Sequence, residues 1–145
     1  MKEGMSIIVK TVTRFVGAMV MLFGTYIILH GHLTPGGGFA GGVILASGFI
    51  LLTLAFGKNI PLKILSQRMA RIFESLGALI FLGMALLGYA GGFFFLNLLP
   101  KGISGKLMSA GIIPFCNIGI GIKVGAALFV IFIALIILRI KPGEK

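Results

Sequence analysis

The chain has 145 residues, of which 58% are hydrophobic and 11% are charged, and its mean hydropathy is +1.14. This composition excludes an ordinary soluble domain and indicates an integral membrane protein. The formal net charge of +10 would suit nucleic-acid binding, but the basic residues stand at the ends of apolar segments and therefore indicate membrane topology instead. The single cysteine, Cys116, excludes an internal disulfide and a cysteine metal cluster.

Four apolar segments are long enough to cross a bilayer, which takes roughly 20 residues of helix. We predict an all-α membrane protein with one domain over residues 1–145 and transmembrane helices at about 9–30, 35–56, 62–90 and 116–139. The segments lack the alternation that the strands of a β-barrel require. The first is also too long for a cleaved signal, and no small-residue cleavage site follows it.

The positions of Lys and Arg predict the orientation of these helices. Cytoplasmic loops carry the excess of basic residues, and the loop after the first helix has none. Both termini of this multi-pass plasma-membrane protein are therefore expected in the cytoplasm. Two basic residues, Lys101 and Lys106, fall in the other predicted outer loop, whereas ten fall at the predicted cytoplasmic side: Lys2, Lys10, Arg14, Lys58, Lys63, Arg68, Arg71, Arg139, Lys141 and Lys145.

A glycine-rich stretch joins the first two helices and reads Gly-His-Leu-Thr-Pro-Gly-Gly-Gly-Phe-Ala-Gly-Gly over residues 31–42. Thr34 is expected to cap a helix that begins at Pro35, since proline needs no backbone donor there. Each glycine inside a helix costs about 1 kcal/mol relative to alanine, so these glycines need a structural reason.

Close approach of another backbone is the expected reason for the glycines. Small residues four apart form the packing surface of many membrane helix pairs. We interpret the surfaces formed in this way as contacts to neighbouring subunits. The residues concerned are Gly37 and Gly41, Gly38 and Gly42, and, in the last helix, Gly121 and Gly125.

Lys123 is the most informative ionisable residue, because it follows Asn117 by a turn and a half and so lies below the expected outer interface. One interpretation places Lys123 on a hydrated ion or proton path. The other is a lysine whose amine reaches the outer headgroups. The sequence leaves both open.

Glu74 and His32 are weaker candidates for the ion path. An interfacial pair between Glu74 and Arg71, three residues earlier, is the interpretation we favour over a membrane-buried proton site. His32 can relay protons or donate to a carbonyl at a helix end, and for His30 the second role is favoured. The sequence lacks metal-ligand spacing, paired acids and a phosphate loop, so we expect no metal, no bound cofactor and no catalysis by this chain alone.

The motif formed by His32, Pro35, Gly36, Gly37, Gly38 and Phe39 together with the flanking glycines resembles the hallmark of the MnhB/MrpB family, small membrane subunits of multisubunit Na+/H+ antiporters. The resemblance covers nearly the whole chain and includes Asn117-Ile-Gly-Ile-Gly in the last helix. It implies a noncatalytic subunit that packs in lipid against other Mrp-type subunits, binds no nucleic acid and helps to form the region through which Na+ and H+ pass.

Two alternatives remain beside this interpretation. Subunits of the same family occur in archaeal membrane-bound hydrogenases and related respiratory complexes. Antiporter members of the family often carry an acidic residue at the position of Asn117 and an apolar one at Lys123, so both departures favour such a redox setting. The second alternative is a purely structural subunit with no residue on the ion path.

Overall fold

The computed structural model describes residues 5–100, 102–103, 105 and 109–140. The described part is helical, with turns between the helices, and four of its segments are long and apolar enough to cross a membrane. The predicted all-α fold with four spans is therefore confirmed. The elements are α1 (Ile7–His30), α2 (Gly37–Phe56), α3 (Asn59–Ile64), α4 (Gln67–Leu87), the short 3-10 helix η1 (Gly88–Gly91) and α5 (Ile113–Ile140).

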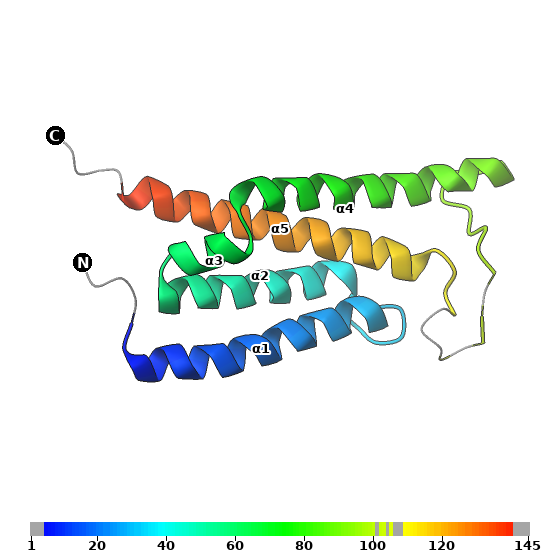
Figure 1. Cartoon of the computed structure of the whole chain (residues 1–145). Helices are drawn as coiled ribbons and strands as arrows, with labels where there is room; N and C mark the ends of the chain where they lie inside the picture. The colour runs from blue at the N-terminus through cyan, green and yellow to red at the C-terminus, as the bar shows by residue number, and fades with distance from the viewer. Residues whose placement is uncertain (1–4, 101, 104, 106–108, 141–145) are drawn as a thin grey trace.

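The four long helices lie side by side in the order α1, α2, α5, α4 (Figure 1). α2 packs between α1 and α5, and α4 packs along α5. A row of this kind leaves broad apolar surfaces open on the helices, as expected for a chain surrounded by lipid or by other membrane proteins. One buried cluster consists of Ala70, Phe129 and Ile133, and the ring of Phe49 lies 5.3 Å from that of Phe129.

The start of α2 differs from the predicted one. The helix begins at Gly37, two residues after Pro35, and Gly36 occupies the position before it without a side-chain cap. Thr34 does not cap α2, because its hydroxyl donates to the carbonyl oxygen of His30 at 3.1 Å. Thr34 therefore closes the end of α1, where carbonyl groups lack partners within the helix.

The predicted third helix over 62–90 is divided in the structure. Leu65 has an extended backbone and separates α3 from α4. The Ser66 side chain then accepts a hydrogen bond from the backbone N–H of Met69 at 3.3 Å, which caps α4. A serine hydroxyl at this position accepts from an N–H group that the first helical turn leaves without a partner. α4 is therefore a separate helix, and its axis can differ from that of α3 where it packs along α5.

The first turn of α1, the short helix α3, the start of α4 and the end of α5 lie at one end of the molecule (Figure 1). Seven of the ten basic residues assigned to the cytoplasmic side belong to the described segments at this end: Lys10, Arg14, Lys58, Lys63, Arg68, Arg71 and Arg139. Lys2, Lys101, Lys106, Lys141 and Lys145 lie outside the described residues. The assignment of this end to the cytoplasm stays a prediction.

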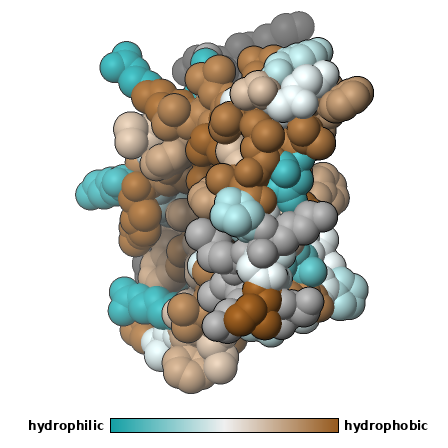
Figure 2. All heavy atoms as spheres, turned by 90° about the vertical axis from the view of Figure 1, so that its right-hand side faces the viewer, coloured by the Kyte–Doolittle hydropathy of each residue, from teal (hydrophilic) through white to brown (hydrophobic). Residues whose placement is uncertain are grey.

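The loop after η1 forms much of the opposite end of the molecule. Its Asn97 side chain donates to the carbonyl oxygen of Ala110 at 3.4 Å and accepts from the N–H of Ile112 at 3.2 Å. These bonds tie the loop to the start of α5. Phe93 and Phe94 are exposed, and Figure 2, which views this end, shows apolar residues over most of the coloured surface.

Candidate functional site at two helix crossings

The turn between α1 and α2 is shaped by its glycines. The backbone N–H groups of Leu33 and Thr34 donate to the carbonyl oxygen of His30 at 2.8 and 2.9 Å. Gly36 and Gly37 then have φ angles of 149° and 83°, positive values that residues with a side chain rarely adopt. The backbone N–H of Gly38, in the first turn of α2, is directed toward Asn117 of α5.

Asn117, in the first turns of α5, contacts the start of α2. Its Oδ1 atom accepts a hydrogen bond from the backbone N–H of Gly38 at 3.3 Å. This N–H is one of the donors that a helix start leaves unsatisfied, so Asn117 caps α2 from a distance of 79 residues along the chain. The contact is very close, because a Cβ atom on Gly38 would overlap the backbone carbonyl of Asn117.

The amide nitrogen of Asn117 lies at the same crossing, next to the end of α1. In the described part of the chain, Nδ2 is buried and has no hydrogen-bond partner. It faces Gly31, where an added Cβ would lie 2.9 Å from it. His32 belongs to the same turn and is half-buried, so the structure brings two of the predicted ion-path residues, Asn117 and His32, to the glycine-rich turn.

The glycines of α2 pack within the chain. A Cβ on Gly42 would lie 2.8 Å from the carbonyl oxygen of Gly121, and one on Gly125 would lie 3.3 Å from the carbonyl oxygen of Gly42. Gly41 meets α1 on the other side, where its Cβ would lie 2.9 Å from the carbonyl oxygen of Gly24. The interpretation that these surfaces face other subunits is therefore wrong for the described contacts, which join α2 to α1 and α5.

A second crossing joins α4 to α5 and was not singled out from the sequence. A Cβ on Gly77 would lie 2.5 Å from the carbonyl oxygen of Gly119 and 2.9 Å from the Cβ of Lys123. In the sequence, Gly119 lies four residues before Lys123 and provides no side chain on one side of the lysine. This spacing could have indicated a close contact at that side. Lys123 itself is exposed on the surface of the chain.

Glu74 lies close to Lys123 as a consequence of this crossing. Side chains three apart on a helix have Cβ atoms about 5–6 Å apart, and Gly77 follows Glu74 by three residues. With the Gly77 position 2.9 Å from the Lys123 Cβ, the Cβ atoms of Glu74 and Lys123 lie within about 9 Å of each other. Two long side chains can close that gap by rotation about their own bonds.

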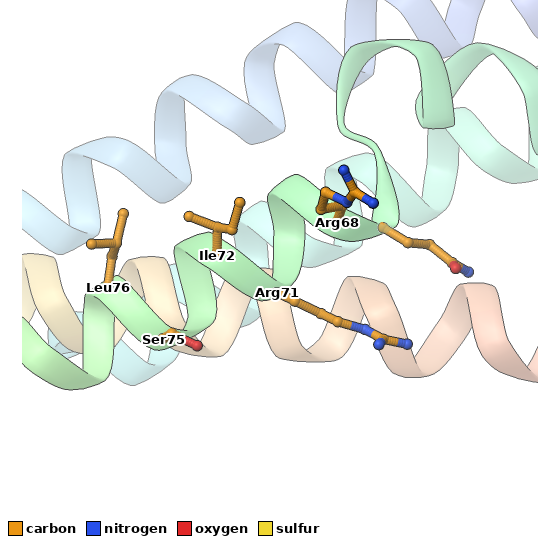
Figure 3. A pocket seen from close by; sticks show the side chains of 6 residues that line it. Arg68, Arg71, Ile72, Ser75 and Leu76 are labelled. Carbon is orange, nitrogen blue, oxygen red and sulfur yellow. The ribbon is translucent and has the colours of Figure 1, made fainter.

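The favoured pair between Glu74 and Arg71 is not formed. Neither residue makes an ion pair within the part of the chain that the structure describes. Arg71 extends along α4 toward its start (Figure 3), whereas Glu74 is half-buried. Among the described residues no three histidines, cysteines or carboxylates are grouped as metal ligands would be.

Replacing Asn117 with alanine is expected to destabilise the protein by about 1–3 kcal/mol, because the buried N–H of Gly38 loses its acceptor. Asn117→Asp retains an acceptor at a helix start, where negative charge is favourable, and should cost less. Thermal unfolding in detergent measures both. Ser47→Ala serves as the control, since that hydroxyl donates to the carbonyl oxygen of Ile44 in its own helix at 2.7 Å; an Asn117→Ala variant as stable as this control would contradict the capping role.

These features define a multi-pass membrane protein in which Asn117 and Lys123 lie at two close helix crossings. The family model described as "Domain related to MnhB subunit of Na+/H+ antiporter" matches residues 8–130. The chain belongs to this family, and the resemblance inferred from its glycine motif is confirmed.

Relatives of the chain come from archaea and bacteria. An uncharacterized protein of Methanocaldococcus jannaschii is 37% identical across 83% of this chain and 48% of its own length. The putative antiporter subunit mnhB2 of Staphylococcus epidermidis is 48% identical over 63 residues, which are 43% of this chain and 44% of that protein. The chain thus spans about half the length of the curated relatives it matches.

A solved structure is also similar. It is a chain of the membrane-bound sulfane sulfur reductase, described as an archaeal respiratory membrane complex. The match has a TM-score of 0.77 and 36% sequence identity, and it covers 90% of this chain and 57% of that one. The hydrogenase setting named among the alternatives stays a prediction.

Proposed function

We propose that the chain is a noncatalytic membrane subunit of a cation/proton antiporter module, and that Lys123 and Glu74 lie on its ion path. Membership of the MnhB family supports the first part. The observation that carries the second is the position of Lys123, exposed on α5 and beside the crossing with α4 at Gly77.

The depth of Lys123 argues for a role in the path. It lies ten residues into α5, which at 1.5 Å per residue is about 15 Å from the helix start, or half of a hydrocarbon layer of roughly 30 Å. That distance exceeds the reach of a four-carbon side chain, so a lysine extending to the headgroups is disfavoured. A charge at this depth costs about 3 kcal/mol or more unless water or a protein group compensates for it.

Glu74 is the compensating group that this chain itself supplies. It is the one acidic residue in the described part of the sequence and lies on α4 one turn from Gly77. A carboxylate and an ammonium group in a medium of low dielectric attract strongly when they meet. A pair that forms and separates with proton transfer or cation passage is a common element of membrane ion paths.

A second candidate function is an accessory subunit of a respiratory complex that contains an antiporter module. The similarity to a chain of the sulfane sulfur reductase complex favours it. The two candidates share the role of Lys123 and differ in partners. Redox subunits and their metal clusters in the purified assembly would support the respiratory setting, and an assembly of membrane subunits alone would support the antiporter.

Transport by the purified complex in vesicles tests the proposal. Lys123→Ala is expected to leave the assembly intact and to reduce Na+-dependent proton movement by about a hundredfold, the lower end of what a positioned proton-transfer group contributes. Lys63→Ala, an exposed lysine on α3, is the matched control and should transport normally. Normal transport by Lys123→Ala would contradict the path role and support a purely structural subunit.

A further inference from the structure

A hollow lies on the surface of α4, near the start of the helix. Its volume is about 540 Å³, and its described lining residues all belong to α4: Gln67, Arg68, Arg71, Ile72, Ser75 and Leu76. In Figure 3, Arg68, Ile72 and Leu76 point to one side of the helix, and Arg71 and Ser75 form a second row. The rows follow the spacing of four residues that aligns side chains along a helix.

The part of this hollow nearest the start of α4 has side chains that can bind an anion. Arg68 and Arg71 are exposed and make no ion pair within the described residues. A guanidinium group presents paired donors that match the oxygens of a phosphate group. Gln67 and Ser75 add further donors, and the positive end of the α4 dipole adds to the attraction.

The lining changes from polar to apolar along the helix. The arginines lie in the first two turns of α4, whereas Ile72 and Leu76 lie deeper in the span. The apolar surface continues through Leu79, which is exposed, to Gly83, where an added Cβ would meet nothing within 4 Å. A molecule with an anionic head and an apolar tail matches this sequence of contacts.

We propose that this hollow binds an anionic phospholipid, with the phosphate group between Arg68 and Arg71 and an acyl chain along Ile72, Leu76 and Leu79. The end of the molecule that bears the site is also the predicted cytoplasmic end, where membranes carry anionic lipids that attract basic side chains. A lipid places its phosphate group at the interfacial depth of the first turns of α4.

The test uses the full chain with its co-purifying subunits, depleted of lipid in neutral detergent. Phosphatidylglycerol should raise the midpoint of thermal unfolding more than phosphatidylcholine does. In the double variant Arg68→Gln/Arg71→Gln the affinity for phosphatidylglycerol should fall by about 30-fold, as expected for two basic side chains near the membrane surface. Lys63→Gln removes a charge from α3 at the same end and should bind like the unmodified protein.

Three results would overturn the proposal. Equal stabilisation by phosphatidylcholine would show that the site does not require an anionic head group. Equal stabilisation by soluble glycerol phosphate at the same concentration would identify a site for free phosphate. Loss of a co-purifying subunit from the double variant, with phosphatidylglycerol still bound, would identify a protein contact. The lipid site is tested by lipid binding and the ion path by transport. The double variant can therefore lose lipid binding and still transport normally, whatever the Lys123→Ala variant does.

Discussion

Gly42→Ala is expected to destabilise the packing of α2 on α5 by about 1–3 kcal/mol, the usual cost of adding a methyl group to a close-packed site. The new Cβ atom would lie 2.8 Å from the carbonyl oxygen of Gly121 and 2.9 Å from the Cβ of Val124. The first of these is a backbone atom, which can move only if the whole helix moves. This cost exceeds the gain of about 1 kcal/mol in helix propensity, and Gly42→Leu should prevent normal packing altogether.

Thermal unfolding in detergent, followed by circular dichroism, measures the effect. Gly83→Ala is the matched control, because it makes the same chemical change in a membrane helix where the added Cβ meets nothing within 4 Å. It should be neutral or stabilise the protein by about 0.5–1 kcal/mol through the lower backbone entropy of alanine in the unfolded chain. A Gly42→Ala variant as stable as Gly83→Ala would contradict the close contact between α2 and α5.

Exchange of the two charges at the second crossing is expected to restore transport that each single change abolishes. Lys123→Glu alone leaves two carboxylates near each other, and Glu74→Lys leaves two ammonium groups, so each should reduce transport by about a hundredfold or more. In the double variant Glu74→Lys/Lys123→Glu, opposite charges again lie within reach of each other. We expect at least a tenfold recovery relative to either single variant, a strongly non-additive result of the kind that contact produces.

The amount of assembled complex in the membrane is measured alongside transport, so that loss of assembly is separated from loss of ion movement. Lys63→Glu reverses a charge on α3, away from the crossing, and should leave transport unchanged. If the exchanged variant assembles yet remains as inactive as the single variants, Glu74 and Lys123 do not act as a pair. In that case the Lys123→Ala result alone would decide whether Lys123 belongs to the path.

The position of Lys123 shows how far a sequence can predict a site of this kind. Its charge within an apolar segment identified it as a candidate, and Gly119, four residues earlier, leaves one flank of the lysine small. The neighbour across that flank, Gly77, belongs to another helix and carried no distinguishing signal of its own. The sequence therefore assigned Glu74 to Arg71 on the same helix, because contacts within one helix are the ones that spacing alone can predict.

The amino-acid sequence by itself determined that this is a membrane protein with four spanning helices, since the length and apolarity of a span are properties of one continuous segment. It also predicted the family through the glycine motif. Only the tertiary structure decided what the glycines meet: Gly42 contacts Gly121, Gly77 contacts Gly119, and Asn117 caps α2 through Gly38, 79 residues earlier in the chain. The physical reason is that rotation and crossing of helices depend on side chains fitting between distant segments, where a single methyl group decides how closely two backbones approach.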